Sequence, residues 1–324
     1  MTQKIKNFLK NIFTVFISII IVLLFIEIIL NIKNKIILSY DIEMWKYAKK
    51  LKEPYNNNKI NHIHKKNSSA TLQDTKISIN SYGFRGTNFS LKKWNEADKK
   101  IIFLGSSVTL GWGVKEKDTL TNVIEELAKR DNKNWKVINA GVGNYNTKRY
   151  INNYFEFYDK FDPNVIIIQY FINDAEILSN KKGNFFTRNF HLGVELWKYI
   201  SSLKDDFKQP NVSDYYFTVY EIEREKNIVR NELKKLKNHC DFYKIKCVLV
   251  FTPDFQLIKK YDLKFINEYI EEICENLDLD YFDLTFKFQD LDSSGITNVK
   301  YNDRHPNDEG HKIMANTIYK YLIN

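Results

Sequence analysis

Four short segments of the sequence combine hydroxyl, imidazole, carboxylate and amide side chains with glycines. They are residues 105–111, 139–147, 171–174 and 303–311. A serine hydroxyl is a poor nucleophile near neutral pH, so an imidazole has to take its proton. His305, held rigid by Pro306, can act as this base on Ser107, and Asp303 can fix the tautomer of the ring and stabilise the imidazolium. Ser107, His305 and Asp303 are therefore the candidate catalytic residues.

An intermediate formed on Ser107 would carry an oxyanion that needs preorganised hydrogen-bond donors. The backbone N–H groups of Ser107, Gly143 and Asn144 and the side-chain amide of Asn173 are the candidates. Each residue alone has a structural interpretation, since serine after a strand commonly forms a turn and Asn-Asp commonly caps a helix. The order of all four segments along the chain favours a catalytic site.

The elements that must position these segments follow from the apolar pattern. Apolar runs predict strands at 101–104, 137–139, 165–170, 247–251 and 280–282. Periodic apolar residues predict helices at 120–127, 148–159, 194–203, 215–238, 263–277 and 309–322. Strands alternating with helices indicate parallel crossovers and a three-layer α/β sandwich, in which ligands bind at the carboxyl ends of the strands. Residues 175–213 are predicted to be an insertion over those ends.

The amino-terminal region predicts a membrane anchor. Residues 12–32 are long and apolar enough to span a bilayer, with Glu27 as the only charge. Three lysines precede this segment and two follow it closely, which favours a cytoplasmic amino terminus over 1–11 and a periplasmic or extracellular remainder. The polar residues 33–76 predict a stalk with one amphipathic piece at 42–51, and 77–324 predict the globular domain.

Composition excludes several other classes of protein. The 324 residues are 44% hydrophobic, which excludes disorder of the whole chain, and the net charge of +9 is not gathered in one block, so nucleic-acid binding is not expected. The segments at 105–113 and 141–146 lack the phosphate-loop and dinucleotide fingerprints. His62 and His64 lack neighbouring ligands and predict a solvated loop, so no metal or other cofactor is expected. Cys240 and Cys247 could pair, or remain buried thiols.

The four segments resemble the blocks of the SGNH or GDSL hydrolase family, particularly its membrane-anchored bacterial members with a Gly-Phe-Arg entry segment. The resemblance covers about residue 77 to the carboxyl terminus and implies a flavodoxin-like α/β/α sandwich with metal-independent ester hydrolysis or acyl transfer. It places the family's nucleophile on Ser107, its glycine turn on Gly143-Asn144, its block-three Asn on Asn173 and its base on His305.

Three positions depart from the family pattern. Ser106 stands where the family usually has Asp, and Asn144 stands where Gly is commonest. The usual Asp-x-x-His would place the acid at Asn302, so Asp303 must act from one residue closer to His305.

Three further residues have expected roles near the site. Asp174 is expected to order its loop, and His311 to pack or cap in the first turn of the last helix. Arg85 is either a surface charge or a clamp beside the site.

These patterns predict a membrane-anchored serine esterase that acts on an ester such as an O-acetylated polysaccharide of the cell envelope. Two alternatives stay open at this stage. One is an O-acetyltransferase that uses the same triad to modify a surface glycan, and the other is a catalytically silent binding or scaffold protein with the same fold.

Overall fold

The structure is a computed structural model of the chain and describes residues 3–37, 39–179, 183–205, 211–255, 257–258, 261–298, 303 and 305–323. The chain divides into two compact units. The smaller unit joins Met1–Trp45 to Lys181–Gln209, and the larger joins Lys46–Asn180 to Pro210–Asn324.

A five-stranded parallel sheet forms the centre of the larger unit. Its strands are β5 (Lys99–Gly105), β6 (Trp135–Asn139), β7 (Val165–Phe171), β8 (Lys246–Thr252) and β9 (Asp280–Asp283). The spatial order is β6-β5-β7-β8-β9, with every neighbouring pair parallel. Numbered along the chain this order is 2-1-3-4-5, which is the flavodoxin-like order. The predicted fold class is therefore confirmed.

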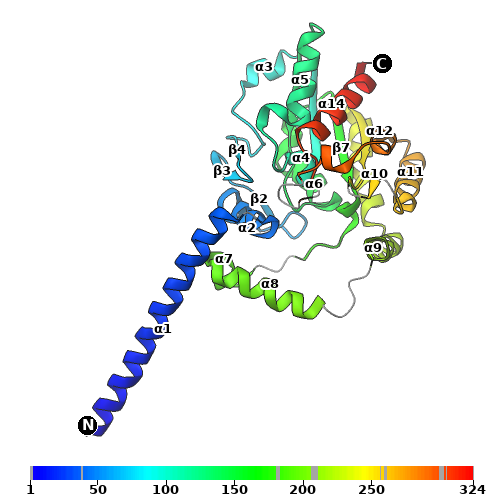
Figure 1. Ribbon diagram of the computed structural model, residues 1–324. Coiled ribbons are helices and arrows are strands. Elements are labelled where there is room, and N and C mark those ends of the chain that lie inside the picture. The colour runs from blue at the N-terminus through cyan, green and yellow to red at the C-terminus, as the bar shows by residue number, and fades with distance from the viewer. Residues whose placement is uncertain are drawn as a thin grey trace. The chain divides into compact units, whose positions relative to one another are not determined.

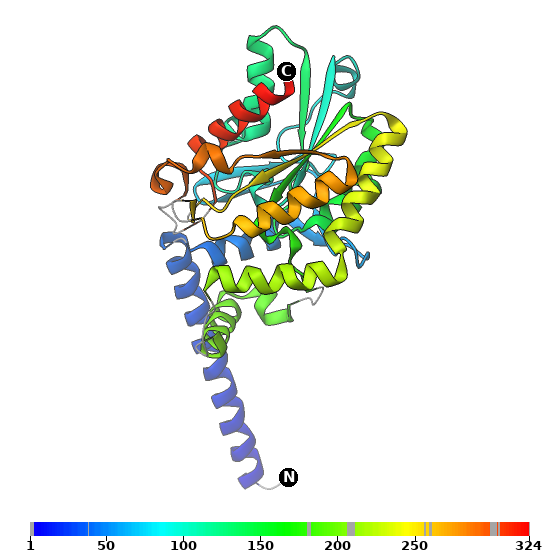
Figure 2. The same cartoon turned by 90° about the vertical axis from the view of Figure 1, so that its right-hand side faces the viewer.

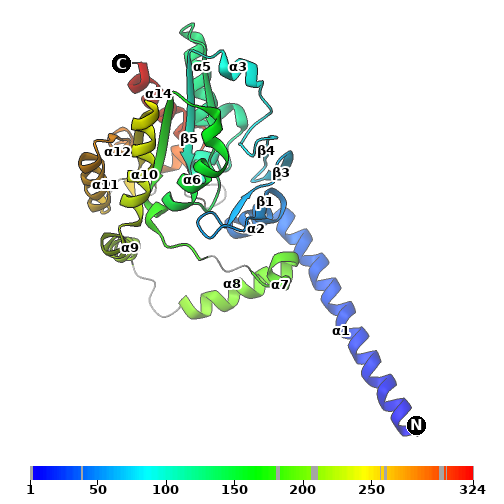
Figure 3. The same cartoon turned by 180° about the vertical axis from the view of Figure 1, so that it is seen from behind.

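Helices cover both faces of the sheet, because the strands are apolar on both sides. Along β5, Ile102 and Leu104 pack into one buried cluster, whereas Ile101 and Phe103 pack into the other. The first face is covered by α6 (Thr147–Asn153), α10 (Ile228–Tyr243) and α11 (Lys264–Leu277), and the second by α5 (Leu120–Arg130) and α14 (Asp308–Ile323). Figures 1 and 3 show these two layers from opposite sides, and Figure 2 shows the red α14 and the yellow α10 on either side of the sheet.

The strand order determines where a ligand can enter. From β5 the chain crosses to β6 on one side, and the next connection leads to β7 on the other side of β5. The loops after β5 and β7 therefore diverge at the carboxyl edge of the sheet, which is the usual ligand position in such folds. Ser107 and Asn173 follow these two strands.

Five further α-helices are described in this unit, and all except α9 have four or five residues. They are α3 (Leu91–Asn95), α4 (Ser107–Leu110), α9 (Val212–Lys226), α12 (Thr285–Phe288) and α13 (Ser293–Ile296). The single helix predicted at 215–238 is wrong, because Asn227 has a φ of 52° and separates α9 from α10. Cys240, Cys247 and Cys274 are free and buried.

The stalk predicted for 33–76 is not an extended linker. This region forms α2 (Tyr40–Leu51) and two antiparallel hairpins, β1 (Lys52–Pro54) with β2 (His62–His64) and β3 (Ser68–Leu72) with β4 (Thr75–Ile79). Tyr47, Leu51 and Ile60 are completely buried. These apolar residues are few and widely spaced among many Lys and Asn residues. The polar composition of the region therefore does not indicate that they pack in a buried core.

The smaller unit contains α1 (Gln3–Ile36), the first part of α2, α7 (Phe185–Asn189) and α8 (His191–Asp205). α1 is long and apolar enough to cross a membrane, with a mean hydropathy of 3.1 over its most apolar window. A continuous globular domain over 77–324 was expected, yet 181–209 form a unit with the amino-terminal helix. Residues 181–209 join this unit because α8 makes polar contacts with α1.

Candidate active site

Ser107 is the first residue of α4, which follows directly on the turn after β5. The turn requires glycine, because a Cβ on Gly105 would lie 2.0 Å from Thr109 Oγ1 and 2.9 Å from the carbonyl oxygen of Gln169. At the other end of α4, Gly111 adopts a φ of 75° and ends the helix after one turn. This tight strand-turn-helix connection places Ser107 at the carboxyl edge of β5.

His305 lies against Ser107. The imidazole Nε2 is 2.7 Å from Ser107 Oγ, and Nδ1 is 2.6 Å from Asp303 Oδ1. With the Nδ1 proton directed at the carboxylate, Nε2 accepts the hydrogen bond of the serine hydroxyl. The loop is held in place because His305 O accepts from the backbone N–H of Asn298 and Pro306 pairs with Thr297. The structure thus brings the three candidate catalytic residues into one hydrogen-bonded chain.

Both oxygens of Asp303 have hydrogen-bond donors. Oδ1 also accepts from the backbone N–H of His305 at 3.0 Å, while Oδ2 accepts from Gln73 Nε2 at 2.6 Å and from Trp112 Nε1 at 2.8 Å. Burial acts to raise the pKa of Asp303, but the hydrogen bond and charge of His305 and the hydrogen bond of Gln73 outweigh it and lower the pKa below its ordinary value. Asp303 is therefore held as a carboxylate despite being 2% exposed.

Gln73 and Trp112 are site residues that sequence reasoning missed. Gln73 occupies the β3–β4 hairpin turn, with a φ of 47°, inside the region interpreted as a stalk. Trp112 stands between Gly111 and Gly113, directly after the first segment, and its amphipathic indole is the one local signal that could have indicated a buried polar partner. Together they anchor a carboxylate that lies only two residues before His305. Asn302, where the usual family spacing would place the acid, lies outside the described residues.

The glycine turn after β6 supplies the oxyanion-hole candidates. The N–H of Gly143 donates to Tyr47 Oη at 2.9 Å, and a Cβ on Gly143 would lie 2.7 Å from a ring carbon of Tyr47. This N–H already has Tyr47 of α2 as its acceptor, so Gly143 does not offer the oxyanion-hole donor that the sequence predicts. Asn144 has a φ of 63°, the left-handed conformation that glycine and asparagine tolerate best, which explains how Asn replaces the commoner Gly here.

Asn173 lies two residues after the end of β7, the neighbour of β5 in the sheet. Its Oδ1 is buried and has no hydrogen-bond partner among the residues that the structure describes. The oxyanion-hole candidates that remain beside Asn173 are the backbone N–H groups of Ser107 and Asn144. Asp174 accepts from the N–H of Phe171 at 3.2 Å and so orders this loop, as expected.

The sequence profile of the GDSL-like Lipase/Acylhydrolase family matches residues 103–313, which is more than half of the chain. The chain belongs to this family of ester hydrolases. The matched region begins in β5 and ends within α14, so it contains all four blocks of the site. No curated protein matches the chain.

Several solved esterase structures resemble the hydrolase at low identity. They include the acetyl xylan esterase AlAXEase (17% identity, 69% of this chain and 99% of that chain covered, TM-score 0.41), the psychrotrophic esterase EstA from Pseudoalteromonas sp. (14%, 70% and 100%, 0.42) and a catalytic mutant of the acetylxylan esterase Axe2 from Geobacillus stearothermophilus (13%, 69% and 94%, 0.46). At these scores the likeness carries no argument about the substrate.

Arg85 holds the loop that carries Trp112 by hydrogen bonds to its backbone. Its guanidinium is buried and donates to the carbonyl oxygens of Leu110 at 3.3 Å and Val114 at 3.1 Å. These carbonyls flank the turn between α4 and the next segment, so Arg85 fixes the indole that donates to Asp303. Of the two roles considered for Arg85, the clamp is the one that the structure shows.

Two other histidines of the hydrolase are buried parts of its framework. His64 Nε2 is 2.6 Å from Tyr47 Oη and its Nδ1 is 3.0 Å from the carbonyl oxygen of Gly83, so the predicted solvated loop is wrong for this residue. His311 Nδ1 accepts from the N–H of Leu120 and thereby caps α5 from the first turn of α14, as expected. Burial lowers the pKa of both His64 and His311 to about 3.

We expect these histidines to make the hydrolase acid-labile. An unfolded histidine has a pKa near 6.5, so between about pH 6.5 and 3 the unfolded chain binds more protons than the folded one. The free energy of unfolding should therefore be undiminished above pH 6.5 and fall by about 1.4 kcal/mol per pH unit for each histidine below it. His311→Gln keeps an acceptor for Leu120 but does not titrate. Urea unfolding from pH 6.5 to 4.5 should show a shallower slope for this variant, and equal slopes would contradict the assignment.

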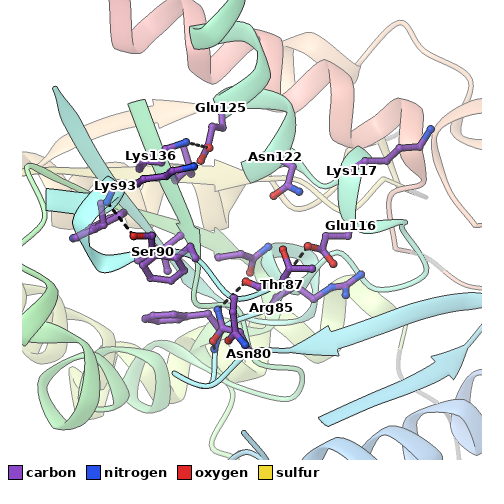
Figure 4. A pocket seen from close by; sticks show the side chains of 18 of the residues that line it. Asn80, Arg85, Thr87, Ser90, Lys93, Glu116, Lys117, Asn122, Glu125 and Lys136 are labelled. Atoms are coloured by element: carbon purple, nitrogen blue, oxygen red, sulfur yellow. Dashed lines mark hydrogen bonds and ion pairs between the residues drawn. The ribbon is translucent and has the colours of Figure 1, made fainter. Parts of the chain in front are cut away.

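A separate hollow of about 510 Å³ lies at the β6 edge of the sheet. Figure 4 shows it lined by mixed charges, among them Lys93, Glu116 and Lys117, together with the ion pair of Lys136 and Glu125. None of Ser107, Asp303 or His305 lines it. Because its acidic and basic groups are interspersed and no buried side-chain donor or acceptor among the lining residues lacks a partner, we assign it no part in the chemistry.

Proposed function

We propose that this hydrolase is a membrane-anchored serine esterase that works through Ser107, His305 and Asp303 by way of an acyl-enzyme. The observation that carries the proposal is the continuous hydrogen-bonded chain from Ser107 Oγ through the His305 ring to Asp303 Oδ1, with distances of 2.7 and 2.6 Å. The distance from nucleophile to base and the distance from base to orienting acid both lie within the range expected for such a triad.

In the proposed mechanism His305 Nε2 takes the proton of Ser107 as Oγ attacks the ester carbonyl. The new oxyanion accepts hydrogen bonds from the N–H groups of Ser107 and Asn144 and from the side-chain amide of Asn173. His305 then protonates the departing alcohol, leaving the acyl group on Ser107. Water, activated by the same imidazole, attacks the acyl-enzyme and releases the acid and free Ser107. Asp303 stays ionised throughout and stabilises the imidazolium.

We further propose that the physiological substrate is an O-acetylated polysaccharide outside the cytoplasm. The support is the apolar helix α1 at the amino terminus, which suits a single-pass anchor, and the excess of lysines before it, which favours an outward catalytic domain. A carboxyl-terminal reporter that is active only outside the cytoplasm tests the orientation. An expressed fusion whose reporter stays inactive would overturn the proposed localisation.

The reaction is tested on the full chain in detergent. We expect release of 4-nitrophenol from 4-nitrophenyl acetate and of acetate from an acetylated xylan. No release from either would overturn the esterase proposal. Acetylation of a sugar acceptor instead of acetate release would assign the acyl-enzyme to a transferase, because the two reactions differ only in whether water or a sugar hydroxyl resolves it.

Asn173→Ala should lower kcat by about 10²- to 10³-fold, the usual effect of removing one oxyanion-hole donor. KM should change little, because the donor acts on charge that develops only in the transition state. Ester-hydrolysis kinetics of the purified variant provide the measurement. A kcat of the variant within threefold of that of the unmodified protein would show that Asn173 is not an oxyanion-hole donor.

A further inference from the structure

α8 turns its polar side towards the apolar helix α1 and the start of α2. Asn34 contacts His191 Nδ1 at 3.0 Å, and Lys33 forms an ion pair with Glu195 at 3.3 Å. One turn along α8, Lys198 pairs with Asp41 at 3.3 Å. The inner side of α8 is therefore held by charged and amide groups.

The opposite side of α8 is apolar and uncovered in the part of the chain that the structure describes. Leu196, Trp197 and Ile200 are 51%, 58% and 51% exposed and share one face by helical spacing, with Tyr199 beside them. Phe185 and Phe186 of α7 are likewise exposed. A surface helix in water has the reverse arrangement, with its apolar stripe inward and its charges outward.

Glu27 connects this pair of helices to α1. Its two carboxylate oxygens accept from the backbone N–H groups of His191 at 2.8 Å and Leu192 at 2.9 Å, at the amino-terminal end of α8. The negative charge is favourable there, because these N–H groups lack partners within the helix and the helix dipole is positive at this end. The one charge in the apolar span of α1 is thus satisfied by the start of α8.

The depth of this contact agrees with a bilayer interface. Glu27 precedes Ile32, the end of the apolar span, by five residues, which is about 7.5 Å along a helix at 1.5 Å per residue. Interfacial amphipathic helices insert their apolar side about 5–10 Å into the boundary between headgroups and acyl chains. Figures 1 and 3 show α8 starting near the carboxyl-terminal part of α1 and leading away from it, as a helix in the membrane plane would.

We propose that α7 and α8 lie in the outer interface of the same bilayer that α1 spans, with Phe185, Phe186, Trp197 and Ile200 in contact with acyl chains. The proposal rests on the membrane anchoring proposed above. Bilayer lipid is the occupant that fits, since the exposed apolar face belongs to the same compact unit as α1 and is rich in the aromatic residues that favour membrane interfaces. The unit then anchors the chain by one spanning and one interfacial element.

Fluorophores on single introduced cysteines test this arrangement in the full chain, reconstituted into phosphatidylcholine and phosphatidylglycerol vesicles. The three native cysteines are buried, so the unmodified protein measures background labelling. Ile200→Cys reports the apolar face, and Ser202→Cys, exposed on the other side of the same helix, is its matched control. Ser18→Cys, in the middle of α1, reports the anchor.

We expect quenchers on lipid chains to reduce the Ile200→Cys signal several-fold more than aqueous iodide does, and the reverse for Ser202→Cys. Equal responses of the two positions would overturn the interfacial orientation. So would shielding of Ile200→Cys from both quenchers, which would indicate protein contact with another copy. If iodide instead reaches Ser18→Cys, the anchor itself fails; lipid quenching at Ser18→Cys without quenching at Ile200→Cys refutes only the interfacial proposal.

Discussion

Ser107→Ala should lower kcat for acetyl esters on the order of 10⁶-fold, the scale seen when the nucleophile of a serine hydrolase is removed. The variant keeps the imidazole and the oxyanion donors but has no group that can form the acyl-enzyme. Its fold should be unchanged, because Ser107 Oγ makes its one described side-chain hydrogen bond with His305. The measurement is single-turnover hydrolysis, with mass spectrometry of the protein to detect the acyl adduct.

Ser106→Ala is the matched control for this loss. Ser106 is the adjacent serine, is 2% exposed and has an Oγ without a hydrogen-bond partner among the described residues. It should keep activity within a fewfold of the unmodified chain. If Ser107→Ala remained within tenfold of full activity, or if Ser106→Ala were the inactive variant, Ser107 would not be the nucleophile.

Most of the larger unit could be predicted from sequence because its signals are local. The apolar runs at 101–104 and 165–170 are too short for helices and too apolar for exposed strands, and both are central strands of the sheet. Ser107 and Asn173 could then be placed at the same edge of the sheet, since parallel neighbours share their carboxyl ends. His305 followed from its position in the loop before the last helix.

The parts that sequence reasoning missed depend on contacts between distant segments. Gln73 lies 230 positions before its partner Asp303, within a region whose Lys- and Asn-rich composition indicates a linker. Tyr47 likewise reaches Gly143 across 96 positions. The helix predicted at 194–203 exists, but its pattern does not reveal whether its apolar face meets protein or lipid, so its separation from the hydrolase unit could not be foreseen.

Asp303→Asn should lower kcat about 10⁴-fold, as expected when the orienting acid of a triad is neutralised. The two hydrogen-bond donors on Oδ2 determine which way the new amide group turns. Gln73 Nε2 and Trp112 Nε1 both point hydrogens at that atom. An asparagine would place its carbonyl oxygen there and its NH₂ group towards His305 Nδ1. Nδ1 must then be the acceptor and Nε2 carries the proton, so the ring cannot accept the proton of Ser107.

The lowered pKa of Asp303 adds a pH test to this variant. A carboxyl group whose pKa is lower in the folded than in the unfolded state stabilises the protein above the unfolded pKa of about 3.9, and this contribution is lost as the pH falls through the folded value. Asparagine does not titrate, so the stability difference between the unmodified chain and Asp303→Asn should shrink as the pH falls below about 4. Urea unfolding at several acid pH values measures this difference.

Reaction of Ser107 with a fluorophosphonate separates the tautomer explanation from general damage. In Asp303→Asn the labelling rate should fall by a factor similar to that of kcat, because both reactions need Nε2 to accept the serine proton. The variant should still unfold cooperatively in urea at pH 7, with a midpoint lowered by the lost contribution of the carboxylate. Trp112→Phe with Asp303→Asn removes one donor from Oδ2 and frees the amide to turn over, so it should recover part of the labelling rate. Full activity of Asp303→Asn alone would instead show that His305 holds its tautomer without this carboxylate.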